Sequence, residues 1–332
     1  MGGNLLVRLL RVLAAAWLIV SVLFLLSRSL PAPRLMAAEL VRTSSTRQLQ
    51  ASEQRYAQRL GLAVPVFYVG VWPWRWHGLD NQYHHWLRGL TRGSLGYSYR
   101  DGRSVAQLLR EALAVTLPLV VLALALTGSL AGAAALALAR RPKWRRRLMP
   151  GLLLLDALPL FVVAMLLLWL LASPEGLALL PAYGLGAAAG QLPGLIYLIL
   201  PASSLVLAAL PGLVLPLTAA LGQEQHQPYA VTARAKGAPA DRLWHRHLLP
   251  NALPPFITRF TDLLPALTAG AVVVEVVFAL PGMGRLLLEA AAARDYPVLL
   301  GGVLLTAAAR LLAWLLADVV SALAYPRLRP TI

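Results

Sequence analysis

Six long apolar segments dominate the pattern of hydrophobic and polar residues along the chain: 5–26, 113–139, 148–171, 192–217, 263–280 and 298–324. Two of them, 113–139 and 192–217, contain no charged residue. A helix needs about 20 mainly apolar residues to cross the hydrocarbon core of a bilayer. Because the apolar runs are continuous and do not alternate at every second position, they predict helices and not barrel strands. The pattern therefore predicts an all-α integral membrane protein with six transmembrane helices.

The first apolar segment has a second interpretation. Its basic start, its apolar stretch over residues 12–26 and the small residues Ala37 and Ala38 also fit a cleaved signal peptide. We favour a retained first helix, because the apolar stretch is at the upper end of the length found in signal peptides. Cleavage would leave the orientation of the rest of the chain unchanged.

The composition agrees with a membrane protein. Only 13% of the 332 residues are charged and 58% are hydrophobic, whereas soluble domains have roughly 25% charged and 45–50% apolar residues. This hydrophobicity excludes intrinsic disorder, and the absence of cysteine excludes a disulfide scaffold. The formal net charge of +16 would suggest a nucleic-acid partner unless the basic residues have another reason to be there.

The basic residues collect in alternate loops, which supplies that reason. Residues 140–147 hold six of them, residues 172–191 hold none, and residues 218–259 are basic again. Cytoplasmic loops carry an excess of Lys and Arg, so both basic loops and both chain ends are expected in the cytoplasm, and no nucleic-acid partner is expected. The predicted order is a first helix (1–26), a periplasmic segment (27–111), a five-helix transmembrane domain (112–325) with its cytoplasmic loop (218–259), and a cytoplasmic tail (326–332).

The cytoplasmic loop is predicted to contain two short helices. Pro228 suits the first turn of a helix over residues 229–236, and Gly237 suits the position after it, where φ is positive. A second helix is predicted to begin at Pro239 and to end at Pro250. Since a plain connection needs only a few residues, this exposed element is predicted to dock to another protein.

The sequence of this loop resembles that of a known family, the membrane-spanning permeases of binding-protein-dependent ABC importers in the dipeptide, oligopeptide and nickel group. The coupling-loop motif of that family is similar to YAVTARAKGAP and RHLLPNALPP, with Gly237 at its signature glycine. The resemblance continues through residues 270–297 (GAVVVEVVFALPGMGRLLLEAAAARDYP) and 317–330 (ADVVSALAYPRLRP). Upstream it includes residues 84–105 (HHWLRGLTRGSLGYSYRDGRSV).

The resemblance implies a type I ABC importer permease fold and a working arrangement in the bacterial inner membrane. It implies two cytoplasmic ATPase subunits that bind ATP, a periplasmic solute-binding protein, and a second permease subunit, expected to be a different, homologous chain. Peptides are the expected cargo. The residues that it assigns to ATPase coupling are Tyr229, Thr232, Ala233, Arg234, Ala235, Lys236 and Gly237. Val231 and Pro250 stand where that family commonly has basic residues.

Nothing in the sequence predicts an enzyme. The two lysines, Lys143 and Lys236, are followed by Trp144 and Gly237, so no G-x-x-x-x-G-K-[ST] phosphate loop is present, and ATP would be bound by partner subunits. No H-E-x-x-H or G-x-S-x-G motif occurs. The histidine pairs at 84/85 and 245/247 lack acidic partners at ligand spacing, so no metal site is expected.

Ionisable residues inside apolar segments are costly and call for a partner. Counting 1.5 Å per residue puts Asp156 and Arg310 at similar depths nearer the cytoplasm, so we predict that they pair, either to hold two helices together or to gate the translocation path. Glu275 precedes the turn at residues 278–282. It either lines the outer mouth of the pathway or hydrogen-bonds to the loop that follows it.

The effect of the prolines and the functional class of the protein each have more than one interpretation. Prolines are expected to bend or break the fourth apolar segment; they are Pro193, Pro201, Pro211 and Pro216. A secondary transporter driven by an ion gradient is the alternative function, and a membrane-embedded enzyme is a third. A secondary transporter predicts inverted repeats, and the sequence has no convincing repeat. The sequence does not identify the cargo.

Overall fold

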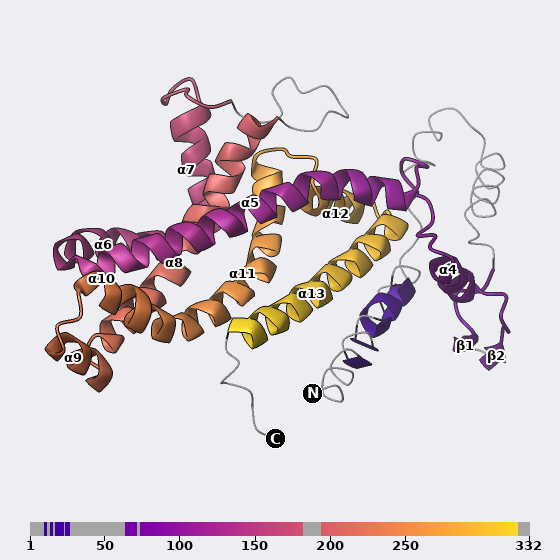
Figure 1. The fold of residues 1–332 in the computed structure, drawn as a ribbon. Coiled ribbons are helices and arrows are strands. Elements are labelled where there is room, and N and C mark those ends of the chain that lie inside the picture. The colour runs from indigo at the N-terminus through magenta and orange to yellow at the C-terminus, as the bar shows by residue number, and fades with distance from the viewer. Residues whose placement is uncertain are drawn as a thin grey trace. The chain divides into compact units, whose positions relative to one another are not determined.

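The structure of the chain is a computed structural model that describes residues 10–11, 14–15, 17–22, 24–26, 64–71, 74–181 and 194–324. Several predicted features lie outside these residues. They are the expected signal-peptide site, the first part of the periplasmic segment, Pro193 and the tail 326–332. The described elements are almost all helical, as predicted (Figure 1). They are β1 (Val69–Val71), β2 (Trp74–Trp76), α4 (Gln82–Thr91), α5 (Val105–Arg140), α6 (Pro142–Ala157), α7 (Leu160–Ala172), α8 (Leu195–Glu224), α9 (Pro228–Ala235), α10 (Ala240–Leu243), a π-helical turn (Trp244–Leu248), α11 (Leu249–Val277), α12 (Met283–Ala292) and α13 (Tyr296–Ala324).

Three of the described helices are long and apolar enough to cross a membrane. They are Val105–Arg140, Ile196–Glu224 and the continuous run Ala240–Val277; α6 and α7 together make a fourth candidate, bent by 110°. Two further apolar helices, Trp17–Leu26 and Tyr296–Leu312, are shorter within the described residues. The prediction of a helical membrane protein is confirmed, and the count of six spans stays a prediction.

The third predicted span is not one straight helix. Leu158 and Pro159 separate α6 from α7, with ψ angles of 128° and 143°. The ring of a proline disfavours helical geometry at the preceding residue, and this explains the break. The predicted loop 140–147 is also wrong in extent, because α5 runs to Arg140 and α6 begins at Pro142, so most of the basic run is helical.

Two other expectations about proline are corrected. Of the two effects expected of Pro201, Pro211 and Pro216, a break does not occur, because all three lie inside one continuous α8; a bend stays a prediction. Pro250 does not end the second helix of the cytoplasmic loop; it lies in the first turn of α11, directly after the π-helical turn. Residues 240–277 form one continuous helical run, and the change to π-helical hydrogen bonding just before Pro250 accommodates a residue that has no N–H to donate.

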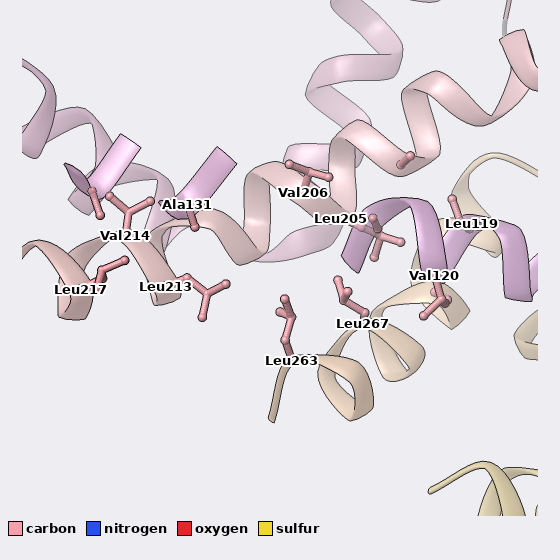
Figure 2. Close-up of a cluster of buried hydrophobic side chains, with 14 of the residues drawn as sticks. Leu119, Val120, Ala131, Leu205, Val206, Leu213, Val214, Leu217, Leu263 and Leu267 are labelled. Carbon is pink, nitrogen blue, oxygen red and sulfur yellow. The ribbon is translucent and has the colours of Figure 1, made fainter. Parts of the chain in front are cut away.

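The chain divides into two compact units, one formed by Met1–Ala112 with Leu286–Leu311, the other by Leu113–Arg285 with Leu312–Ile332. The second unit has an apolar core to which α5, α8 and α11 all contribute (Figure 2). Leu119, Leu205 and Leu267 are representative, and each is at most 3% exposed.

A stripe of small residues runs along α5 in the second unit. Its members occur at every fourth position and are fully buried: Ala123, Thr127, Ala131 and Ala135. Positions four apart share one face of a helix. Helices in a bilayer associate through close packing and not through a hydrophobic effect between them, so such stripes let backbones approach. This stripe is therefore a packing surface of the membrane core.

The first unit has a small aromatic core. Phe24 from the N-terminal helical residues and Tyr83 from α4 have ring centroids 5.4 Å apart, and Leu300 of α13 belongs to the same buried cluster. The hydroxyls of Ser21 and Tyr83 lie 2.8 Å apart and share a hydrogen bond. The strands β1 and β2 form an antiparallel hairpin next to α4, with Val69 paired to Trp76.

Candidate coupling element and buried carboxylates

The first helix predicted for the loop 218–259 is present as α9. Pro228 occupies its first turn, and the helix has one face on the core of the second unit. Ala230 is completely buried, and Tyr229 and Ala233 pack against the core from the same side. A small residue at Ala230 allows the backbone of α9 to lie close to the helices beneath it.

The stop at Gly237 is confirmed in its geometry. Gly237 has φ +77°, and its N–H donates to the carbonyl oxygen of Arg234 at 2.9 Å. The N–H of Ala238 donates to the carbonyl oxygen of Ala233 at 3.1 Å. These two bonds make a Schellman motif, which satisfies carbonyl groups that a helix end otherwise leaves without donors. A Cβ atom added at Gly237 would meet no atom of the described chain within 4 Å, so glycine is required there by the backbone conformation.

The seven residues assigned to coupling divide into two faces. Tyr229 and Ala233 are half-buried against the chain's own core, whereas the remaining five are exposed: Thr232, Arg234, Ala235, Lys236 and Gly237. Val231 joins the exposed face and is 55% exposed. The exposed face of α9 thus has an apolar centre at Val231 and Ala235, flanked by two cations; we call it the α9 outer face.

Two hydrogen bonds attach α9 to the end of α8. The hydroxyl of Tyr229 donates to Oε2 of Glu224, and the guanidinium of Arg234 donates to the carbonyl oxygen of Gln225 at 2.8 Å. Burial, and then the hydrogen bond to Glu224, raise the pKa of Tyr229. Tyr229 therefore stays a neutral hydroxyl donor at physiological pH, and its bond to Glu224 is kept.

The end of α5 lies near α10 in Figure 1, and Arg140 is the last residue of α5. Its Nη1 lies 3.1 Å from Oδ1 of Asp241, and its guanidinium carbon lies 5.4 Å from the ring centre of Trp244. Asp241 is 84% exposed, so the ion pair contributes at most about 1 kcal/mol. The contact with the Trp244 ring adds a cation–π attraction of about 0.5–1 kcal/mol. Through Arg140, the end of α5 contacts both α10 and the π-helical turn.

Glu275 is a buried acceptor at the end of α11. It is 0% exposed. The hydroxyl of Thr116 donates to Oε1 at 2.5 Å, and the N–H groups of Gly284 and Arg285 donate to Oε2 at 2.7 and 3.2 Å. Thr116 also accepts from the N–H of Met283 at 2.8 Å. Of the two roles expected for Glu275, hydrogen bonding to the loop after it is confirmed, and lining a pathway stays a prediction.

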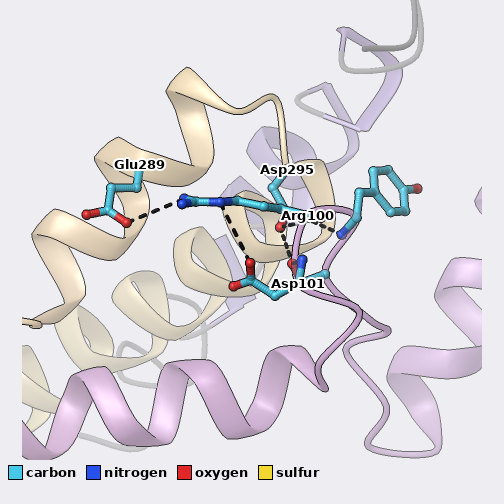
Figure 3. Close-up of polar contacts among 6 residues, drawn as sticks. Arg100, Asp101, Glu289 and Asp295 are labelled. Atoms are coloured by element: carbon cyan, nitrogen blue, oxygen red, sulfur yellow. Dashed lines mark hydrogen bonds and ion pairs between the residues drawn. The ribbon is translucent and has the colours of Figure 1, made fainter. Parts of the chain in front are cut away.

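A second buried carboxylate, Asp295, organises a loop in the first unit (Figure 3). Asp295 is 3% exposed and follows α12. It accepts hydrogen bonds from the Ser98 hydroxyl and from the N–H of Tyr99 at 3.0 Å. Arg100, next along the chain, extends between Asp101 and Glu289, with a 3.5 Å ion pair to Glu289. These contacts hold the segment before α5 onto the turn between α12 and α13.

The predicted pair of Asp156 and Arg310 stays a prediction. Asp156 lies on α6 in the second unit and Arg310 lies on α13 in the first, and each is exposed within its own unit. Within the described residues, no group of three or more histidine and acidic side chains could hold a metal ion.

Sequence reasoning missed several residues of these sites. Thr116 and Glu275 are 159 positions apart, and Ser98 and Asp295 are 197 apart, so no local pattern links them. Arg140 is one of six basic residues in the run 140–147, and nothing in that run distinguishes it from the others. Val231 differs from the family pattern, but single apolar residues are common on protein surfaces, so the sequence alone does not mark it as part of a contact surface.

The fold defines a class of protein: a helical membrane protein with a short, partly exposed helix, α9, packed on its apolar core. Residues 125–330 match the family of inner membrane components of binding-protein-dependent transport systems. The match covers more than half of the chain, and the chain belongs to this family.

Several relatives match this chain over most of their own length. The oligopeptide transport system permease protein OppB of Haemophilus influenzae is 32% identical over 256 residues, which is 76% of this chain and 81% of the relative. The oligopeptide transport system permease protein AppB of Bacillus subtilis is 30% identical, covering 84% and 85%. A probable peptide ABC transporter permease protein of Sinorhizobium fredii, y4tP, is 29% identical, covering 99% and 100%.

Two substitutions distinguish whether Gly237 is needed for its positive φ or for its small size. Asparagine tolerates positive φ better than alanine, for which the left-handed conformation costs roughly 1–2 kcal/mol. We expect Gly237→Asn to retain more ATPase subunit in a pull-down of the assembled complex than Gly237→Ala, although asparagine is larger. If Gly237→Ala retains as much or more, glycine is needed for space at a partner and not for the backbone.

The hydrogen bonds of Glu275 predict a stability effect. Glu275→Gln places an NH₂ group among three donors, so at least one donor loses its acceptor, which costs about 1–3 kcal/mol. The unfolding temperature in detergent should fall accordingly. Glu289→Gln is the matched control, because Glu289 is 43% exposed and an exposed ion pair contributes at most about 1 kcal/mol. Equal shifts for the two variants would contradict the role given to Glu275.

Proposed function

We propose that this chain is a membrane-spanning permease subunit of an ATP-driven importer that takes up peptides. It forms half of the translocation pathway and passes movement from separate ATPase subunits to that pathway through α9. Peptide cargo is supported by the relatives, which are named as oligopeptide or peptide permeases. ATP hydrolysis belongs to the separate ATPase subunits and not to this chain.

The observation that carries the proposal is the construction of α9. The helix is only eight residues long, and isolated helices of that length are not stable in water. Here it is fixed by a buried Ala230, by the Tyr229 hydrogen bond to Glu224, and by the stop at Gly237. A short helix held so firmly, with its apolar centre left exposed at Val231, is suited to receive a partner and to transmit its motion.

The remaining features of the assembly follow from the family resemblance and the charge pattern. We infer six spans, with both chain ends and α9 in the cytoplasm of a bacterium and with the segment before α5 in the periplasm. The partners are a second, homologous permease chain, two ATPase subunits and a periplasmic solute-binding protein. Coupling involves the α9 outer face, and ATP is bound by the partner subunits.

The proposal is tested by uptake into proteoliposomes that contain the complete importer. Peptide uptake should require the binding protein and internal ATP, and should persist when ionophores abolish ion gradients. Uptake that continues without ATP and stops with ionophores would instead indicate a secondary transporter.

A single substitution tests the α9 outer face in the same assay. Ala235→Leu adds bulk to an exposed helical position, and leucine is also a good helix former, only slightly below alanine. We therefore expect uptake and peptide-stimulated ATP hydrolysis to fall at least tenfold while the chain still folds. Ala106→Leu, at an exposed position of α5, is the matched control and should leave uptake near the wild-type rate. Full activity of Ala235→Leu would contradict the docking role.

A further inference from the structure

The hairpin of the first unit exposes two tryptophans on one of its faces. Trp74 is 84% exposed and Trp76 is 71% exposed. Both are on β2, two positions apart, so they project from the same side of the strand, and Arg75 between them projects from the other. Indole rings are rarely left in water in this way without a binding partner.

The hairpin is attached to α4, which in turn contacts the end of the first apolar segment. His77 donates its N–H to the Tyr68 carbonyl oxygen at 2.8 Å, and the Tyr68 and Trp76 rings stack with centroids 6.1 Å apart. Tyr68 and its neighbour Phe67 both pack on Tyr83 of α4, with centroids 5.9 and 5.3 Å away. The hairpin and α4 therefore form one packed module.

That module is fixed to the ends of two apolar helices. Tyr83 shares a hydrogen bond with Ser21 and packs on Phe24, within two turns of the end of the apolar helix at Leu26. On its other side the cluster includes Leu300, in the second turn of α13. Both contacts are close to where an apolar helix meets the membrane surface, so the module lies at that surface.

The size of the hairpin limits how far it can extend. Each strand has three residues, which span about 10 Å at roughly 3.3 Å per residue. The interfacial region on each side of a bilayer is about 5–8 Å thick. Trp74 and Trp76 are thus within reach of the lipid headgroups, the zone in which the amphipathic indole ring is most favourable.

We propose that the face of the hairpin formed by Trp74 and Trp76 inserts into the headgroup region of the bilayer and anchors the module before α5 to the membrane surface. The partner is lipid, recognised through the indole rings. The anchor fixes the height of α4, and the loop held by Asp295 follows α4 directly in the chain. This inference depends on the membrane location of the chain and not on its cargo.

The absence of cysteine in the chain allows a direct test. Trp74→Cys, Arg75→Cys and Trp76→Cys would each carry a spin label in the complete importer, assembled with cysteine-free partners in vesicles of phosphatidylethanolamine and phosphatidylglycerol. Labels at 74 and 76 should be several-fold more accessible to oxygen, and several-fold less accessible to a water-soluble nickel chelate, than the label at 75. The alternation is the expected result, because only one face of the strand meets lipid.

Two outcomes would overturn the proposal. Labels at all three positions could be equally open to the nickel chelate, which means that the face is in water. Labels at 74 and 76 could instead become protected only when the solute-binding protein is added, which means that the face docks a protein.

A second measurement leaves the hairpin intact in case a cysteine substitution disturbs it. The wild-type chain is grown with 5-fluorotryptophan, and Trp74→Phe and Trp76→Phe serve only to assign the two fluorine resonances. Both resonances should broaden with a lipid-borne spin label and not with a water-soluble gadolinium chelate. Broadening by the chelate alone would contradict the proposal.

Discussion

Helices in this protein end sharply because their last carbonyl groups must find donors, and four helices satisfy them by the same device. In α4, α9, α11 and α12, a residue with positive φ follows the helix cap, and two N–H groups bond back into the last turn. These residues are Gly93, Gly237, Ala279 and Arg294. Each of these caps sets the direction in which the chain leaves its helix.

The two helix ends that lack glycine, at Ala279 and Arg294, are strained, since a left-handed conformation costs roughly 1–2 kcal/mol for residues other than glycine. Strain of this kind persists only where the surroundings over-determine the backbone. Ala279 is followed by a turn bonded to Glu275, and Arg294 is followed directly by Asp295, which holds the loop at residues 98–100. The two buried carboxylates thus account for conformations that local sequence disfavours. At Gly237 no carboxylate is needed, and α9 keeps its outer face free for a partner.

The sequence was sufficient wherever a feature depends on neighbouring residues. Continuous apolar runs predicted the helical membrane protein, and Pro228 with Gly237 predicted both ends of α9 to within one residue. Proline effects were predicted less well. The break at Pro159 was missed. A break in α8, one of the two effects expected of its prolines, does not occur, and Pro250 does not end a helix, because neighbouring helices and a π-helical turn decide whether the backbone adapts. The hydrogen bonds of Glu275 and Asp295 join residues too distant in sequence for any periodicity to reveal.

We propose that the α9 outer face is the surface through which ATPase subunits act on this chain. A photo-cross-linking amino acid at Val231, in the complete importer, tests it most directly; the same group at Glu175, an exposed residue after α7, is the control. The account predicts a covalent adduct with the ATPase subunit from position 231 and none from position 175. No adduct from position 231, or equal yields from both positions, would contradict it.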